Sequence, residues 1–136
     1  MLEVVNSYAW PTDGFPFASL GIRVVDLALR LGVTTKQWDV DGLGRATGFG
    51  FRAASGRVYL LEEIDLSVKH GLVNGSTVYA DAGELASNGG AVLAEEMITA
   101  LGLAPTEVAT VAGSAAERYA AELVEKIRIA NANRSV

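Results

Sequence analysis

The chain has no cysteine and one histidine, His70, among its 136 residues. Without cysteine there is no disulfide, and no thiolate can act as a nucleophile or a metal ligand. A single histidine also excludes a metal site built from several histidines. We therefore expect no metal and no other cofactor. The lack of disulfides is typical of a cytoplasmic protein, and a cytoplasmic location is our expectation.

Long apolar runs and clustered positive charge are also missing. No segment approaches the about 18 consecutive apolar residues of a transmembrane helix. The opening residues, MLEVVN, lack the basic and then apolar pattern of a signal peptide. The 11 Lys and Arg residues are spread along the chain, whereas a nucleic-acid-binding surface needs them clustered. We therefore expect neither a membrane nor a nucleic acid as a partner.

The chain is rich in apolar residues and carries an excess of negative charge. Hydrophobic residues make up 50%, charged residues 20%, and the net charge is −5. This length and composition predict one folded domain over residues 1–136, with a frayed tail over residues 131–136. The acidic balance favours solubility and would steer encounters with a basic partner.

Residues 46–68, ATGFGFRAASGRVYLLEEIDLSV, carry the clearest local pattern. Phe49 and Phe51 alternate with glycine and arginine, which is the period of a β-strand. The loop 53–56 ends in a glycine that suits a short hairpin turn. Branched and aromatic residues at 57–61 then supply the returning strand. The sequence therefore predicts a β-hairpin at the centre of the fold.

The segment Leu61–His70 has two interpretations. The apolar alternation shifts by one residue after Leu61, which predicts a strand with a bulge or bend. Acids at its start, Lys69 and His70 at its end, and the following Gly71 would also suit a short helix. We favour the strand. Asn74-Gly75 then predicts a hairpin turn into a strand at Ser76–Ala80, which gives an antiparallel meander of about four strands.

A helix is predicted over residues 16–31, with Pro16 in its first turn and Gly32 as its C-terminal cap. Its two apolar stripes are Phe17, Leu20, Val24, Leu27 and Leu31, and Ile22, Val25 and Leu29. If a helix is apolar on two sides, each side needs a contact that removes it from water. The second stripe therefore predicts a contact with the domain's own sheet, with a partner, or with a second subunit in a homodimer.

The last third of the chain predicts two or three helices. Ser87 or Asn88 would cap a helix that ends at Gly102, and Pro105 would open a shorter piece. A capping box over 114–117 predicts a final helix with the stripe Tyr119, Ala120, Leu123, Ile127 and Ala130. Together with a weak strand at Leu2 and Val4, the pattern predicts an α+β domain. Its helices pack on a central antiparallel meander of about four strands.

No motif for catalysis or phosphate binding rises above chance. The glycine-rich run 42–50 precedes a strand, whereas a phosphate-binding loop opens a helix. The run Asp39–Gly42 resembles the start of a calcium loop, but the twelfth position is Gly50 instead of Glu. His70 is the one weak catalytic candidate, and no nucleophile is selected by its spacing. We therefore assign no catalytic residue and favour a protein that is not an enzyme.

Acidic residues gather around one tryptophan. If the meander runs as predicted, one end of the sheet carries Trp38 with Asp39, Asp41, Glu62, Glu63 and Asp65. An aromatic anchor ringed by acids suits the surface of a basic partner. The leading hypothesis is therefore a small acidic cytoplasmic protein that masks a basic protein partner. Inhibitors of toxins (immunity proteins) work in this way, as do secretion chaperones, which we favour less.

The alternative hypothesis is a small metal-independent enzyme or ligand-binding domain. It would use a pocket on the sheet face, lined by Trp38, Tyr59, Tyr79, His70 and a carboxylate. The predicted core for either function is Leu20, Val24, Leu27, Phe49, Val58, Leu60, Val78, Leu93, Leu123 and Ile127.

Overall fold

The computed structural model describes residues 2–40, 42, 44–65 and 75–134. The strands are β1 (Glu3–Val5), β2 (Gly14–Leu20), β3 (Lys36–Val40), β4 (Gly44–Arg52), β5 (Val58–Ile64), β6 (Ser76–Asp81) and β7 (Val108–Val111). The helices are α1 (Val24–Leu31), α3 (Ala82–Asn88), α4 (Gly90–Leu101) and α5 (Ser114–Arg134), with 3-10 turns at Ser7–Ala9 and Pro105–Glu107. None of these helices is both long and apolar enough to cross a membrane, among the residues described.

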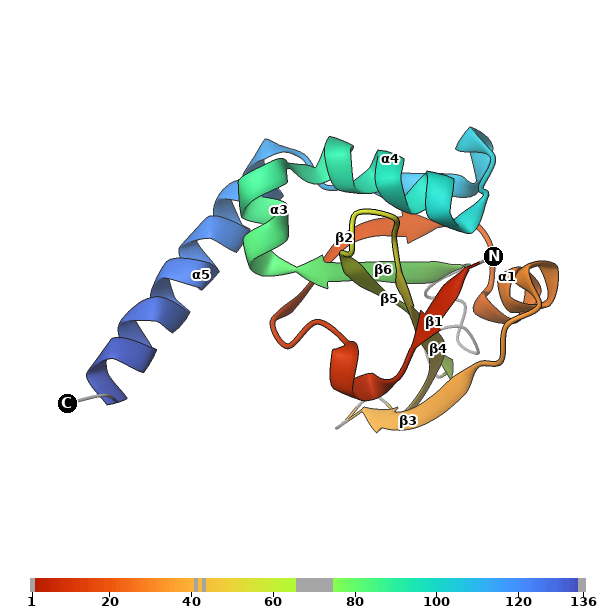
Figure 1. Ribbon diagram of the computed structural model, residues 1–136, viewed down its shortest axis with the longest axis horizontal. Coiled ribbons are helices and arrows are strands. Elements are labelled where there is room, and N and C mark those ends of the chain that lie inside the picture. The colour runs from red at the N-terminus through yellow and green to blue at the C-terminus, as the bar shows by residue number, and fades with distance from the viewer. Residues whose placement is uncertain (1, 41, 43, 66–74, 135–136) are drawn as a thin grey trace.

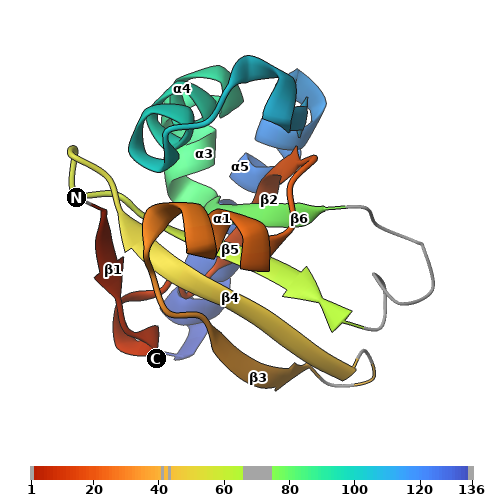
Figure 2. The same ribbon diagram turned by 90° about the vertical axis from the view of Figure 1, so that its right-hand side faces the viewer.

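One antiparallel sheet of seven strands forms the centre of the molecule, in the order β1-β4-β5-β6-β2-β7, with β3 also paired to β4 (Figure 1). The predicted α+β class is confirmed. The consecutive strands β3 to β6 form the meander, and β1, β2 and β7 extend the sheet beyond the predicted four strands. Helices α3 and α4 lie along one side of the sheet, and β3, paired to β4, lies at the end of the sheet far from them (Figures 1 and 2).

The predicted hairpin is confirmed, but the predicted bulge is wrong. Strands β4 and β5 pair without a shift from Arg52↔Val58 to Ala46↔Ile64. Gly56, in the loop, has a φ of +96°, a conformation that other residues adopt only with strain. The strand therefore runs on to Ile64, and Leu60 simply faces away from the core. Residues 66–70 of this segment, and Asn74 of the predicted turn, lie outside the described residues.

The predicted helix over residues 16–31 is wrong in its first half. Residues 14–20 form β2, which pairs with both β6 and β7. Pro16, which has no N–H to donate, sits where the register with β6 shifts, between Pro16 and Ala18. Helix α1 begins only at Val24 and ends at Gly32, whose φ of 69° confirms the predicted cap. The spacing of Phe17 and Leu20 favours a helix, but hydrogen bonding of this segment to a strand on each of its edges makes it a strand.

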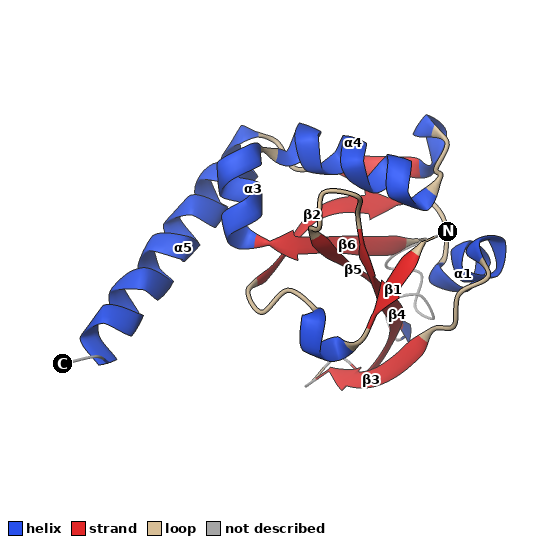
Figure 3. Cartoon of the chain, in the orientation of Figure 1, coloured by secondary structure: helices blue, strands red, loops and turns tan. Residues whose placement is uncertain are grey.

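Three further short elements were not predicted, namely β3, α3 and β7, of which Figure 3 labels β3 and α3. The shorter helical piece predicted from Pro105 is only the 3-10 turn Pro105–Glu107, and β7 follows it. Helix α3 is capped by Asp81, which accepts hydrogen bonds from the N–H groups of Gly83 and Glu84. Ser87 and Asn88 belong to this helix, so they do not cap α4. The first turn of α4 is held instead by Glu117, whose Oε1 accepts from the Gly90 N–H at 2.7 Å. Helix α5 begins at Ser114, which confirms the predicted helix, but the predicted capping box is wrong. The Glu117 N–H donates to the Gly113 carbonyl at 3.0 Å, and the Glu117 carboxylate is used by Gly90.

The core lies between the sheet and the helices. Six of the ten predicted core residues are buried, namely Leu20, Val24, Leu27, Phe49, Val78 and Leu93. The other four, Val58, Leu60, Leu123 and Ile127, are only half-buried. Val58 and Leu60 face away from the helices, and Leu123 and Ile127 belong to α5, which projects away from the sheet (Figure 1). The predicted tail 131–136 overlaps the last turn of α5, which continues to Arg134.

The predicted second apolar stripe, Ile22, Val25 and Leu29, is only partly covered within the domain. Val25 is 48% exposed and Leu29 is 77% exposed, whereas Ile22 is half-buried and packs against the core. Cover by a second subunit therefore stays a prediction for Val25 and Leu29.

Two leucines on α1 test this assignment of faces. Leu27 is fully buried and Leu29 is mostly exposed, so Leu27→Ala should lower the free energy of unfolding by about 2–5 kcal/mol because it leaves a cavity. Leu29→Ala, the matched control, should change it by at most about 0.5 kcal/mol. Urea denaturation at several protein concentrations measures both. A loss at Leu29 equal to that at Leu27 would mean that a second subunit covers the stripe.

Candidate functional site

One face of the sheet lies away from the helices and is only partly exposed to solvent. Along β5 and β6, buried side chains alternate with half-buried ones, because successive side chains of a strand point to opposite faces. The buried set joins the core with the helices. The half-buried set, with two tryptophans, forms what we call the open face: Trp10, Trp38, Leu60, Glu62, Ile64 and Tyr79.

Two tryptophans lie against two glycines of β4 on the open face. A Cβ atom added at Gly48 would lie 3.1 Å from Cη2 of Trp38, and one added at Gly50 would lie 2.3 Å from Nε1 of Trp10. The indole ring centroids are 4.9 Å apart, with the ring planes at 57°. The Trp10 indole N–H also donates to the Val5 carbonyl at 3.3 Å. Because glycine has no side chain, Gly48 and Gly50 leave room on this face of β4 for the two indole rings.

Glu62 brings a negative charge next to this pair. It stands opposite Gly48 on one side and opposite Thr77 of β6 on the other. The Tyr79 hydroxyl donates to Glu62 Oε1 at 3.0 Å. Burial, and then the charge of Glu62, raise the pKa of Tyr79 above its ordinary value, so this phenol remains a proton donor. Within the part of the chain that the structure describes, Oε2 of Glu62 has no hydrogen-bond partner.

Glu63, the next residue, points into the core instead. Its two carboxylate oxygens accept from Nε and Nη2 of Arg23 at 3.1 and 2.8 Å, and Oε1 also accepts from the Val24 N–H at 3.3 Å. The Glu63 side chain is 4% exposed and that of Arg23 is 47% exposed. The hydrogen bond to Glu63 raises the pKa of Arg23. Glu63 therefore joins the start of α1 to β5 and is not available at the surface.

The structure divides the predicted acidic cluster between the two faces. Trp38 and Glu62 share the open face. Asp39 alternates with Trp38 on β3 and stands opposite Arg45, so it points to the other side. Asp65 accepts a hydrogen bond from the Thr47 hydroxyl at 3.2 Å, on the side of Glu63. Asp41 and His70 lie outside the described residues.

Trp10 was not predicted as part of the site. The sequence around it, Trp10-Pro11-Thr12-Asp13-Gly14, indicates only a turn. The 3-10 turn Ser7–Ala9 precedes it, and the Asn6 side chain caps that turn by accepting from the Tyr8 N–H. This local turn carries Trp10 back over β4. A contact between residues so far apart in sequence as Trp10 and Gly50 leaves no local signal.

The pocket expected for an enzyme is not assembled from its predicted residues. Tyr59 is fully buried on the helix side, opposite to Trp38 and Tyr79, and its hydroxyl donates to Glu96 at 2.7 Å. Burial and the charge of Glu96 raise the pKa of Tyr59. In the described ranges, no group of three or more His, Cys, Asp or Glu side chains could hold a metal ion.

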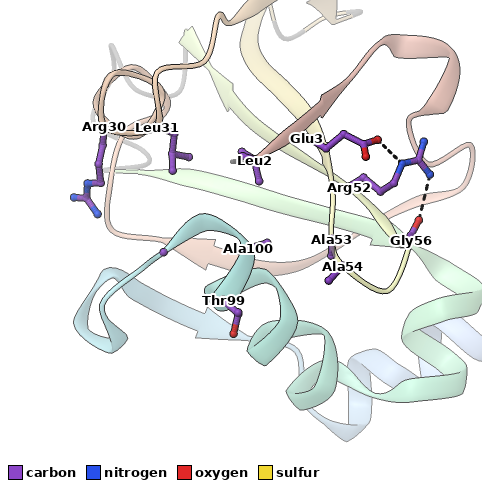
Figure 4. Close-up of a pocket in the computed structure, with 11 residues that line it drawn as sticks. Leu2, Glu3, Arg30, Leu31, Arg52, Ala53, Ala54, Gly56, Thr99 and Ala100 are labelled. Atoms are coloured by element: carbon purple, nitrogen blue, oxygen red, sulfur yellow. Dashed lines mark hydrogen bonds and ion pairs between the residues drawn. The ribbon is translucent and has the colours of Figure 1, made fainter.

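A hollow lies elsewhere, between β1, the β4–β5 loop and the last turns of α1 and α4 (Figure 4). Its volume is about 720 Å³. Arg52 on its rim donates to Glu3 and to the Gly56 carbonyl. Arg30 points away from the other lining residues (Figure 4) and donates to Glu107. Both cations are thus already paired with carboxylates.

The chain matches no protein-family profile, no curated protein and no solved structure. The open face is therefore interpreted from its own residues. It offers an aromatic surface, a carboxylate with one oxygen that has no hydrogen-bond partner among the described residues, and a phenol donor. Trp38, Glu62 and Tyr79 are on paired strands, and Trp10 is in the turn after β1. Such a set is suited to binding.

Two glycine variants test how the aromatic pair is seated. In Gly50→Ala the new methyl group meets the Trp10 indole, which can swing away, so we expect a folded protein with altered tryptophan fluorescence. In Gly48→Ala the methyl group would lie 1.9 Å from the Leu61 carbonyl oxygen, and the two strands must separate. We expect this variant to lose about 2–4 kcal/mol of stability. Equal, small effects of both variants would contradict the close packing.

Arg23→Ala tests the structural role of Glu63. It leaves a buried carboxylate unpaired, and we expect a loss of about 2–3 kcal/mol, less than for a fully buried pair since Arg23 is half exposed. The control is Arg52→Ala, which breaks the pair with Glu3 in which the two side chains are 39% and 60% exposed. That change should cost at most about 1 kcal/mol. Similar losses in urea denaturation would show that Glu63 is hydrated.

Proposed function

We propose that this chain is a non-enzymatic binding protein that masks a positively charged protein partner through the open face. The observation that carries the proposal is the Trp10–Trp38 pair, held on glycines beside the half-buried Glu62. Tryptophan dominates binding energy at interfaces because it brings a large, rigid apolar surface. Here the rings are already ordered before a partner arrives, which lowers the entropy cost of binding.

The charge of the chain supports a basic partner. The net charge is −5, and a field of that sign speeds the approach of a cationic protein. Within this class we place an inhibitor of the immunity-protein type before a secretion chaperone. A cytoplasmic location belongs to the same proposal. An inhibitor needs a stable scaffold and one surface for its target, and in this proposal the buried core and the open face serve these two roles.

Binding kinetics test the proposal once a partner has been captured by pull-down and identified by mass spectrometry. Trp38→Ala should raise the dissociation rate by about 30-fold, equivalent to about 2 kcal/mol, if the indole is a central anchor. Tyr119→Ala is the matched control, since this aromatic residue is 60% exposed on α5. It should leave the dissociation rate unchanged. Equal effects of the two variants would exclude the open face as the docking surface.

Varying the salt concentration in the same experiment distinguishes the electrostatic contribution to the association rate from the contribution of the Trp38 contact to the dissociation rate. The association rate should fall as salt rises from 0.1 to 1 M, because the Debye length shortens from about 10 Å to about 3 Å. The dissociation rate of the wild-type complex should change less. An association rate that does not depend on salt would contradict a charged partner.

A further inference from the structure

We infer that the open face contains a site for one arginine side chain of the partner, stacked on the Trp38 indole and paired with Glu62 Oε2. This inference rests on the proposed function and names the chemical group that the face recognises. It follows from three features of the described residues, which are the position of the indole, the state of the carboxylate and the competing cations.

The indole and the carboxylate lie side by side. Cη2 of Trp38 would be 3.1 Å from a Cβ on Gly48, and Gly48 is the direct partner of Glu62 across β4 and β5. Side chains that stand opposite in an antiparallel pair have Cβ atoms about 4.5–5.5 Å apart. A planar cation resting on the outer ring of Trp38 therefore comes within reach of the Glu62 carboxylate.

The carboxylate is held in place and only partly satisfied. Tyr79 fixes Oε1 through a hydrogen bond of 3.0 Å, which limits the directions in which Oε2 can point. Within the described part of the chain, the ion pairs use other carboxylates, namely Glu3, Glu63, Glu84, Glu96, Glu107 and Glu125. A half-buried carboxylate beside aromatic rings gains most from a cation that also covers those rings.

Among the described residues, one cation that can compete on this face is Lys36. It stands opposite Gly48 from the β3 side and so shares the face of Trp38. Its side chain is exposed, and it forms no ion pair with Glu62 within the described residues. Lys36 repels an incoming cation and can compete weakly for Glu62, so its removal should favour the arginine.

Guanidinium fits these features better than ammonium. It is planar, stacks flat on an indole and is more weakly hydrated, so its transfer to a half-buried surface costs less. Oε2 of Glu62, which has no partner among the described residues, can accept a charge-assisted hydrogen bond from it. A metal ion needs more oxygen ligands than this arrangement provides.

The test titrates the full chain with Nα-acetyl-arginine amide, with the lysine analogue, and with the citrulline analogue, which is neutral and nearly the same shape. The indole N–H signals of Trp10 and Trp38 in nitrogen-edited NMR report on the site. The arginine amide should shift the Trp38 signal saturably with a Kd of about 1–10 mM. Lysine amide should bind more weakly, and citrulline amide should give no saturable shift.

Three variants locate the site. Glu62→Gln should weaken arginine binding by at least about fivefold, because it removes the charge and keeps the shape. Lys36→Gln, an exposed change that leaves the fold intact, should tighten binding by about twofold. Glu122→Gln, on the exposed face of α5, is the control and should leave it unchanged.

The outcomes separate the two proposals. An equal shift from citrulline, no saturable shift from arginine, or a loss of binding in Lys36→Gln overturns the arginine site. If partner capture still depends on Trp38 in that case, the proposed function stands without it. If arginine binds at Trp38 but the captured partner does not displace it, the arginine site stands and the proposed function fails for this face.

Discussion

The unshifted pairing of β4 with β5 is the constraint on which the rest of the structure depends. Because the register holds from Arg52↔Val58 to Ala46↔Ile64, the two adjacent glutamates of β5 point to opposite faces. Glu63 joins Arg23 and the start of α1 inside the protein, while Glu62 reaches the open face. A shift of one residue would bury Glu62 without a partner and expose Glu63.

The same register explains why glycine alternates along β4. Gly48 and Gly50 face the open side, and the helix side carries Phe49 and Phe51, which are buried. The bulky rings fill the core and their small neighbours leave shallow space outside. Trp38 from β3 and Trp10 from the turn after β1 occupy that space. The two phenylalanines of β4 thus contribute to the core, and its two glycines contribute to the candidate site on the other face.

Local patterns predicted those elements whose signals lie within a few residues. The β4–β5 hairpin, the strand at Ser76–Ala80 and the caps at Gly32 and Gly102 belong to this group. Elements that depend on distant partners were missed. Residues 14–20 form a strand because β6 and β7 flank them, although their spacing also fits a helix. The short strands β3 and β7 likewise need neighbours that the local sequence does not reveal.

The candidate site was predicted in part for the same physical reason. Trp38 and Glu62 were identified, but Asp39, Glu63 and Asp65 were grouped with them because they are close in sequence. In a strand, adjacent residues point to opposite faces of the sheet. Residues that are neighbours in the sequence can therefore have side chains on different faces. Trp10 joins the site through a fold-back that no local pattern encodes.

Carboxylate labelling of the chain, alone and in complex with the captured partner, tests the central claim most directly. A carbodiimide couples a small amine to exposed carboxylates, and fragmentation mass spectrometry resolves Glu62 from Glu63. We expect Glu62 to be labelled in the free chain and protected in the complex, and Glu63 to stay unlabelled in both. Labelling of Glu63 in the free chain would contradict the division of the two glutamates, and labelling of Glu62 unchanged by the partner would contradict binding at the open face.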